Sequence, residues 1–597
     1  MAQGPNYRSQ TYTTQSGTVI RKNSSRIIIP TRGASQYNTS WQHLDRFAFT
    51  TRALNALRLS CPAPENPTRP IAMYLLPLVV GLVGLYLLLK FFSSTRRASA
   101  PLPPGPSPLP LVGNIRDLPS PDSPDWLHWL KHKDAYGSIS TVSVLGQRLI
   151  ILNDANLAID LLEKRSAIHS DRPKMPFAEL AGWGDGLVIL PYSSRFKAYR
   201  KSLHREIGSK ASVARFNALQ EVEVRRFLLR LINQPEDLVG HIRKLAGAVI
   251  LKIAYGYSID PHKRDPLVDL ADEAVEQFSL AVRPGTWMVD VLPFLRHIPA
   301  WFPGAGFQRT AQFFRKQSQA VADIPFAFVH QQMAQPGYEP SYASSLLEGK
   351  VLAPGTEEET VIKWSSATLY AAGADTTVST TTTFFLAMAL YPDVQRKAQE
   401  EIDRVIGPGR LPTDADRPNL PYVDALVKEA LRWHPVGPMG IPHRSMEDDI
   451  CGGYLIPKGS IILPNIWAFC HDPAAYKDPM TFDPARFLGA HPERDPHYLA
   501  FGFGRRVCPG RTLADSNIFL TVAQTLGSCW VGKALTEQGE EVEVRPEFLP
   551  GTISHPAPFG VRVTPRSKEY ERLIRDVERE FPWEVEHSER LRREFFA

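Results

Sequence analysis

The chain of 597 residues lacks the features that would give it a second redox domain or a disulfide framework. No G-x-G-x-x-G run follows a strand pattern, and no further segment is long enough for a flavin domain. Few, isolated cysteines without a C-x-x-C pair indicate a reducing compartment that faces the cytosol. The five cysteines are widely scattered, at Cys61, Cys451, Cys470, Cys508 and Cys529.

Acidic residues are scarce at the start of the chain. The first 72 residues hold nine Lys and Arg but only Asp45 and Glu65, a balance of +7, whereas the whole chain carries +6. The remaining residues therefore sum to −1. The basic balance gives no argument that the main part of the chain binds nucleic acid, and no such partner is expected.

Residues 1–70 are rich in Ser, Thr, Arg and Asn and show no apolar period. One interpretation is a disordered extension. A second is an organelle transit peptide, which is also poor in acids and rich in Arg and Ser. A third is a spurious upstream segment, since Met73 stands where a membrane anchor would begin. The third is favoured over disorder, and both over a transit peptide.

An apolar run follows, and no charge interrupts residues 71–89. About 20 apolar residues, at a rise of ~1.5 Å each, cross a hydrocarbon core of ~30 Å. We therefore predict a transmembrane anchor helix at 71–92. A buried core helix or a cleaved signal peptide is less favoured, because the run is long and no small-residue cleavage site follows it. Lys90, Arg96 and Arg97 predict a cytosolic side after the span.

Residues 93–113 form a basic, proline-rich hinge that is stiff and extended. The pattern from 114 to 566 predicts one large, mainly helical domain with small β-sheets, including a hairpin around Gly146. An aromatic, proline-rich connection at 298–304 lies on a membrane or covers a pocket. Residues 567–597 are a charged tail that is expected to form a surface helix.

Cys508 lies in a glycine-rich loop just ahead of a helical pattern. Gly502, Gly504 and Gly510 allow the backbone to turn sharply or to approach a flat ligand. A helix N-terminus and nearby arginines stabilise a thiolate, which is a ligand for soft metals. On composition alone, a lone intracellular cysteine is more often a small buried hydrophobe.

The pattern F-x-x-G-x-R-x-C-x-G at 501–510 resembles the haem-binding loop of the cytochrome P-450 superfamily, fungal microsomal type. The resemblance implies the α-rich triangular cytochrome P-450 fold and haem b (iron protoporphyrin IX), with the Cys508 thiolate as the metal ligand. It also implies that Arg506 pairs with a haem propionate and that Phe501 packs beside the sulfur. The glycines expected against the haem are Gly502 and Gly510.

A long helical pattern at 360–391 contains glycine and threonines that are poor helix formers. A hydroxyl that takes the backbone's hydrogen bonds can open a helix locally. By resemblance, Asp375 and Thr376 are catalytic and relay protons to dioxygen, while Ala372 and Gly373 let the helix pass close over the haem. The alternative is a buried threonine that satisfies only its own helix.

Two further basic positions match the family's haem-binding pattern. In the basic stretch at 195–205, Arg200 is kept, but Phe196 replaces a tryptophan and cannot donate a hydrogen bond. A solvated basic face, or a docking surface for an acidic redox partner, is the alternative for this stretch. His443, thirteen residues before the I-P-K-G turn, is expected to meet a propionate, with Arg444 ranked second.

Glu429 and Arg432 have the E-x-x-R spacing, which on a solvated helix is worth only a few tenths of a kcal/mol. The resemblance implies instead a buried structural triad with Arg486. Ala485 replaces the glutamate that usually precedes this arginine.

Together these patterns predict a monooxygenase that inserts one oxygen atom of O₂ into a lipophilic small molecule, in fungal secondary or xenobiotic metabolism. Its electrons come from NADPH through a separate NADPH–cytochrome reductase, with cytochrome b5 as an optional second donor. The expected location is the endoplasmic reticulum membrane, with one span and a cytosolic catalytic domain.

Two alternatives stay open at this point. One is a family member that rearranges or dehydrates its substrate without O₂, and the other is a membrane-anchored haem sensor without catalysis. The sequence does not identify the substrate.

Overall fold

The computed structural model describes residues 81, 84, 100–120 and 123–596. The predictions for 1–70 and for a span at 71–92 fall outside these residues, apart from Gly81 and Gly84. Among the described residues, no helix is both long enough and apolar enough to cross a membrane. The chain divides into two units, Met1–Arg96 and Arg97–Ala597, and the second unit is described below.

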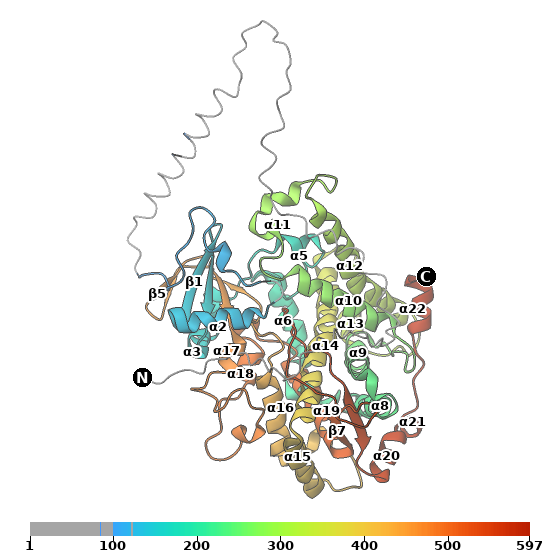
Figure 1. The fold of residues 1–597 in the computed structure, drawn as a ribbon. Helices are drawn as coiled ribbons and strands as arrows, with labels where there is room; N and C mark the ends of the chain where they lie inside the picture. The colour runs from blue at the N-terminus through green and yellow to red at the C-terminus, as the bar shows by residue number, and fades with distance from the viewer. Residues whose placement is uncertain (1–80, 82–83, 85–99, 121–122, 597) are drawn as a thin grey trace, which may run out of the picture. The chain divides into compact units, whose positions relative to one another are not determined.

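A 34-residue helix, α14 (Glu357–Leu390), runs through the middle of the second unit (Figure 1). Its start is well capped, because the Thr356 hydroxyl accepts from the Glu359 amide and three glutamates occupy the first turn. Most of its length is buried on all sides, so it forms the axis of the main core. The helices in contact with it include α6 (Ser194–Ile207), α9 (Leu238–Tyr255), α10 (Pro266–Ala281), α12 (Gly306–Met333), α16 (Pro421–Trp433) and α19 (Arg511–Ser528).

The prediction of a mainly helical domain with small sheets is confirmed. The other α-helices are α2 (Asp125–Tyr136), α3 (Ala155–Ala158), α4 (Ser166–His169), α5 (Pro176–Leu180), α7 (Lys210–Ala214), α8 (Asn217–Asn233), α11 (Met288–Val291), α13 (Tyr342–Leu347), α15 (Pro392–Val405), α17 (Ile466–Cys470) and α18 (His497–Ala500). Short helical turns occur at η2 (Ile115–Asp117), η3 (Ile159–Lys164), η4 (Pro235–Asp237), η5 (Pro293–His297), η6 (Asp414–Asn419), η7 (Pro484–Phe487) and η8 (Gly504–Arg506).

The largest sheet has four strands in the order β1-β2-β6-β3 and lies to one side of the helices (Figure 1). The hairpin of β1 (Ile139–Val144) and β2 (Gln147–Leu152) turns at Gly146, whose φ of +87° suits glycine. β6 (Ile461–Pro464) is parallel to β2, and β3 (His443–Arg444) is antiparallel to β6. Two-stranded sheets pair β4 (Asp449–Cys451) with β5 (Tyr454–Ile456), and β7 (Cys529–Lys533) with β8 (Val561–Pro565).

The charged tail forms three short helices, α20 (Lys568–Arg575), α21 (Val577–Glu580) and α22 (Ser588–Phe595). Three of its apolar side chains pack into the main core, since Ile574, Val577 and Leu591 are fully buried. α20 and α21 contact α8, and α22 contacts α10. The tail is therefore amphipathic, and its apolar face is part of the core.

Candidate functional site

The loop around Cys508 is fixed by its own backbone. The Cys508 amide donates to the Phe501 carbonyl at 2.8 Å, which closes the loop immediately before α19. Gly502 and Gly504 have φ angles of +76° and +54°, a region that glycine enters freely. A Cβ on Gly504 would lie 2.3 Å from the Leu162 carbonyl oxygen, so no larger residue fits there. The predicted glycine frame thus presents one thiol.

The Cys508 side chain is accessible, yet protein atoms surround it deeply enough for burial to raise the pKa of its thiol. The amides of Gly510 and Arg511 and the charges of Arg200 and Arg511 act in the opposite direction on this pKa. Accessibility combined with deep placement means that the thiol faces an internal space and not bulk solvent.

The burial of α14 is interrupted over a single turn. Ala372 is exposed in mid-helix, and Thr376, one turn later, is partly exposed. The Thr376 hydroxyl donates to the Ala372 carbonyl at 2.7 Å, as in a back-bonded helix threonine. A loop links this region to the cysteine loop, because Arg506 donates to the Leu187 carbonyl while the Leu187 amide donates to Thr368, one turn before Ala372.

Two of the predicted α14 residues lie against other segments of the chain. Asp375 is buried, and its Oδ2 lies 3.2 Å from Nε2 of His555. A Cβ on Gly373 would lie 2.7 Å from the Ile250 side chain, so this glycine permits close packing of α9 against α14. Of the four residues predicted on this helix, Ala372 is exposed, Gly373 and Thr376 are partly exposed, and Asp375 is buried.

Basic side chains from four separate segments lie near the cysteine loop. Arg506 donates to the carbonyls of Ser170 and Leu190, each at 2.7 Å, and its guanidinium stacks 3.8 Å above the Phe196 ring. Arg200 donates to the Val507 carbonyl beside Cys508. The replacement of tryptophan by Phe196 thus retains a stacking surface, although it loses a hydrogen-bond donor.

His443 and a residue that the sequence did not single out complete this group. His443 Nδ1 lies 2.8 Å from the His169 carbonyl. Arg172 donates to the carbonyls of Val188, Ile441 and Pro442 at 2.7–2.9 Å. Arg172 stands in a loop between an aspartate and a proline, without a periodic pattern around it, so only its folded position reveals it.

The positive charge of this group is poorly compensated. Burial, together with the charge of Arg200, lowers the pKa of Arg506 to about 10, although Asp171 opposes the shift. Burial also lowers the pKa of Arg172, and the charge of Arg506 adds to that effect. Carbonyl oxygens satisfy the donors without neutralising their charge, so these arginines favour an anionic ligand.

These residues fit haem b by the chemistry of their donors. The accessible Cys508 sulfur is a single protein ligand of a kind that holds haem iron, and the buried arginines suit carboxylates. Cys508 would hold the iron. Arg172, Arg200, Arg506 and His443 would hold the two propionates.

The predicted triad is buried and complete. Glu429 accepts from Arg432 Nε and Nη2 at 2.7 and 2.8 Å and from Arg486 Nε at 3.2 Å. The Asp483 amide donates to the same carboxylate at 2.7 Å. Arg486 also pairs with Glu493 at 2.7 Å, which supplies the acid missing at Ala485. The three segments are thereby tied behind the cysteine loop.

A second charged network supports the cysteine loop from α18. His497 lies between two carboxylates, 2.7 Å from Asp495 and 2.9 Å from Asp515, and stacks on Phe501. Although burial opposes it, hydrogen bonds to these acids raise the pKa of His497 to about 9. Arg417 also pairs with Asp515 at 2.7 Å. The sequence analysis missed this network, whose members are spread over about a hundred residues.

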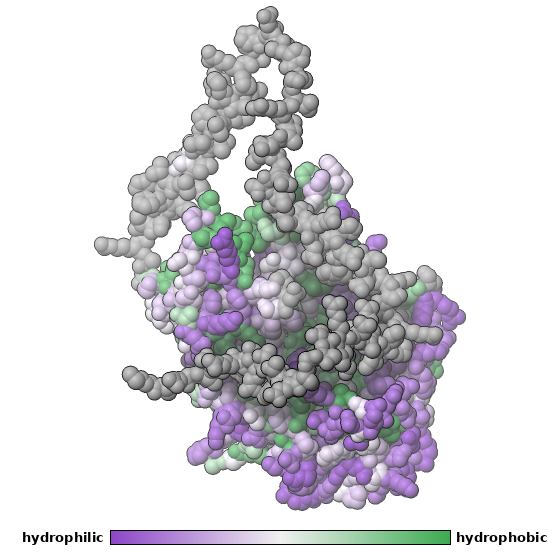
Figure 2. Space-filling model, viewed as in Figure 1, coloured by the Kyte–Doolittle hydropathy of each residue, from purple (hydrophilic) through white to green (hydrophobic). Residues whose placement is uncertain are grey.

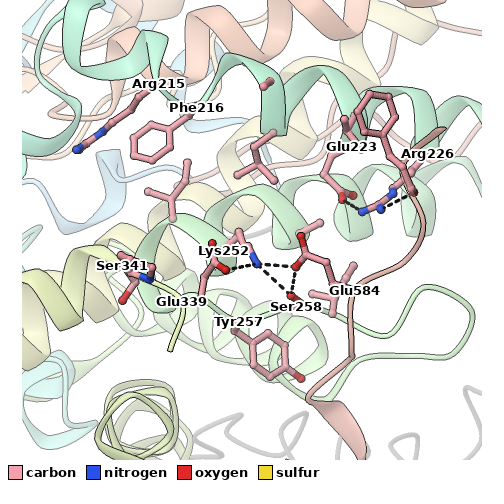
Figure 3. Close-up of a pocket in the computed structure, with 18 of the residues that line it drawn as sticks. Arg215, Phe216, Glu223, Arg226, Lys252, Tyr257, Ser258, Glu339, Ser341 and Glu584 are labelled. Carbon is pink, nitrogen blue, oxygen red and sulfur yellow. Dashed lines mark hydrogen bonds and ion pairs between the residues drawn. The ribbon is translucent and has the colours of Figure 1, made fainter. Parts of the chain in front are cut away.

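A separate cavity of about 960 Å³ lies between α8, α9 and the tail (Figure 3). Several of its charges are paired within its own wall, including Lys252 with Glu584 at 2.6 Å and Arg226 with Glu223 at 2.6 Å. None of the predicted site residues lines it. It is therefore distinct from the Cys508 site.

Comparisons with known proteins agree with this geometry. A family model described as Cytochrome P450 matches residues 103–558. The chain is 48% identical over 524 residues to cytochrome P450 monooxygenase ppsD of Aspergillus oryzae, covering 87% of this chain and 99% of that protein. It is 49% identical over 512 residues to cytochrome P450 monooxygenase claR of Ampulloclitocybe clavipes, covering 85% and 94%. It is also 44% identical over 506 residues to O-methylsterigmatocystin oxidoreductase of Aspergillus flavus, covering 84% and 95%.

Replacing Glu429→Gln should lower the free energy of unfolding by about 3–5 kcal/mol, because two buried guanidinium groups lose their carboxylate. Urea unfolding of the purified protein measures the change. Glu493→Gln removes a more exposed partner of Arg486 and serves as the matched control, with a smaller loss. Equal losses in the two variants would contradict a structural role centred on Glu429.

The His497 network predicts a pH dependence of stability. A folded pKa of about 9, above the ordinary 6.5, gives stability that is fully present below pH 6.5 and is lost as pH rises through 9. The loss should be on the order of 3 kcal/mol. Urea unfolding across this window should show the decline in the wild type and a flatter profile in His497→Gln. The exposed His491→Gln should behave as the wild type, and an unchanged slope in His497→Gln would disprove the assignment.

Proposed function

This chain belongs to the cytochrome P450 family of haem-thiolate monooxygenases, and we propose that it oxygenates a lipophilic small molecule in fungal secondary metabolism, with electrons from NADPH delivered by a separate reductase. The observation that carries the proposal is the accessible Cys508 thiol, which is deeply placed and lies near the charge of Arg200. A cysteine with only a structural role would not require arginines around it.

Family members bind haem b through a cysteine thiolate, and the bound haem supplies the iron that activates O₂. The protein's own groups would position it: Cys508 would hold the iron, and Arg172, Arg200, Arg506 and His443 would hold its carboxylates. The exposed Ala372 would leave room for O₂ and substrate. Thr376 holds a proton at its hydroxyl on the same turn, and the acid of this helix segment is Asp375, which contacts His555.

A reductase partner is supported by the exposed side of α6. Lys197, Lys201 and Arg205 are exposed at intervals of four residues and so form one basic stripe. The opposite face of α6 is buried, and Arg200 on this helix reaches the loop beside Cys508. A basic surface next to the thiolate side of the haem suits an acidic electron-donating protein. NADPH–cytochrome reductase is the proposed partner, with cytochrome b5 as an optional second donor.

The substrate class is supported by the names of relatives. One relative is named for the oxidation of O-methylsterigmatocystin, a small molecule, and others are named as monooxygenases. The particular substrate of this chain is left open.

We place the protein at the endoplasmic reticulum membrane, anchored at 71–92 with its catalytic domain in the cytosol. Apolar side chains at one end of the domain support this placement: Leu111 is 83% exposed and Trp301 80% exposed. Leu118, which follows Leu111, lies close to Gly285, which precedes Trp301, because a Cβ on Gly285 would lie 3.9 Å from Leu118. Figure 2 shows hydrophobic residues gathered at the end that carries α11. An apolar patch of this kind suits contact with a lipid surface.

Cys508→Ser should abolish oxygenation and the thiolate signature in the absorption spectrum of the reduced carbon monoxide complex, because a serine hydroxyl does not supply a thiolate. Its circular dichroism should stay close to that of the wild type. The assay follows the transfer of label from isotopically labelled O₂ into a panel of lipophilic compounds with reductase and NADPH. A variant with full turnover would overturn the proposal. A wild-type protein that binds haem but consumes no oxygen would favour the haem sensor.

Fractionation tests the membrane placement. In microsomes the full-length protein should stay with the membrane after an alkaline carbonate wash, and protease added without detergent should degrade its catalytic domain. A protein resident in the lumen is the protected control. Release by carbonate would contradict a spanning anchor, and protection from protease would contradict a cytosolic domain.

A further inference from the structure

The cavity between α8, α9 and the C-terminal tail is large enough to hold a small molecule of its own. Its volume of about 960 Å³ falls within the range of ligand pockets. Apolar side chains reach it from all three elements, among them Leu219 and Val222 of α8, Ile253 of α9, and Phe581 and Trp583 of the tail. A wall of this composition suits the apolar body of a ligand.

Aromatic rings in this wall already attract positive charge. The Arg226 guanidinium lies 4.0 Å from the centre of the Trp583 ring. The Arg215 guanidinium lies 4.7 Å from the centre of the Phe216 ring. Tyr257 adds a further aromatic ring to the wall. Because the face of an aromatic ring carries partial negative charge, these rings favour a cationic ligand over an anionic one.

One ammonium is shared by two carboxylates at the exposed side of the cavity. Lys252 Nζ lies 2.6 Å from a carboxylate oxygen of Glu584 and 3.6 Å from one of Glu339 (Figure 3). The Glu584 and Glu339 side chains are 56% and 55% exposed, so solvent reaches this part of the wall. The group of three carries a net charge of −1. A second cation that enters here would therefore neutralise it.

The buried part of the wall also offers a negatively charged acceptor. The Glu223 side chain is buried, and its Oε2 has no hydrogen-bond partner among the described residues. The neighbouring Arg226 uses both Nη groups, one on Glu223 and the other on the Phe581 carbonyl, and its Nε is the atom left without a partner in the same part of the chain. Arg205, at the α6 end of the wall, is exposed to solvent. A ligand that donates hydrogen bonds and carries positive charge matches the unpaired carboxylate oxygen.

α9 separates this cavity from α14. Ala248 and Lys252, four residues apart on one face of α9, line the cavity. Ile250 lies on the other side of α9, because a Cβ on Gly373 of α14 would lie 2.7 Å from its side chain. A ligand in the cavity therefore does not compete for space with a ligand at Cys508.

We propose that this cavity is a second ligand site, which binds an organic cation with an apolar body. The cationic group, a quaternary or protonated amine, lies at Glu339 and Glu584 beside the aromatic rings. The apolar body lies against α8 and the tail. The site goes beyond the proposed monooxygenase function and does not rest on it, because none of its wall residues is assigned to haem or O₂.

Calorimetric titration of the full-length holoenzyme with octyltrimethylammonium tests the site. The nitrogen of this probe has no electron pair to donate, so it cannot bind haem iron. We expect one site with an affinity at least about tenfold higher than that for octanoate, which has an apolar chain and the opposite charge. Choline, which has the cation without the chain, should also bind at least about tenfold more weakly.

The haem absorption spectrum, recorded during the same titration, should stay unchanged. Equal affinities for octyltrimethylammonium and octanoate would overturn the proposal, and so would a choline affinity equal to that of the longer probe. A spectral change that follows probe binding would place the probe at the haem and would also count against a separate site.

Two variants with opposite expected effects locate the cation. Glu339→Gln keeps the shape of the side chain but removes a carboxylate, so the affinity for octyltrimethylammonium should fall by about threefold or more. Lys252→Gln removes the competing ammonium, so the affinity should rise by a similar factor. Damage to the cavity alone would weaken binding in both variants.

The matched control is Glu537→Gln, which removes the charge of an exposed glutamate outside the cavity wall. It should bind the probe as the wild type does. An unchanged affinity in Glu339→Gln, or a weaker one in Lys252→Gln, would disprove the proposed position of the cation. A protein that consumes no oxygen would still bind the probe, so the two proposals fail independently.

Discussion

The buried carboxylate of Glu429 is the interaction on which the rest of the site depends. It accepts four hydrogen bonds from Arg432, Arg486 and the Asp483 amide, and none of the three charged side chains is appreciably exposed. Isolated charges at this depth would be prohibitively costly, so each member is stable only while the others are in place. Arg432 also donates to the carbonyls of Cys470 and Pro479, which extends the tie to the end of α17. The wall behind the cysteine loop is therefore an all-or-none arrangement.

The arginines near Cys508 are held in a different way from those of the triad. Arg172 and Arg506 are buried like Arg432, yet their direct partners are carbonyl oxygens and their pKa values are lowered. The fold thus stores positive charge that only an anionic ligand neutralises. Binding of two propionates at this place would relieve the repulsion, so haem binding and stability of this region should be coupled. The charges of the triad neutralise one another within the chain, whereas an anionic cofactor would neutralise the charges of Arg172 and Arg506.

Most of the site residues that the sequence could predict lie in short motifs. The cysteine loop, the E-x-x-R pair and the small-residue turn of α14 depend on fixed local spacing, and the helices and the hairpin at Gly146 follow from periodicity and turn chemistry. Contacts between distant residues were not readable in this way. The parallel pairing of β2 with β6 joins segments about three hundred residues apart. The contacts of Arg172 and His555 form only when distant loops fold back onto one another and onto α14.

Glu429 and Asp375 show how the same chemical group takes two roles. Glu429 has four donors and no solvent access, so its carboxylate cannot turn without stranding buried charge. Asp375 has one partner at 3.2 Å, and that partner is 27% exposed. A pair of this kind is worth little more than a surface ion pair, about 1 kcal/mol, and thermal motion breaks it readily. The difference in donor number and burial therefore separates a carboxylate that is fixed in the fold from one that a single, partly exposed partner holds.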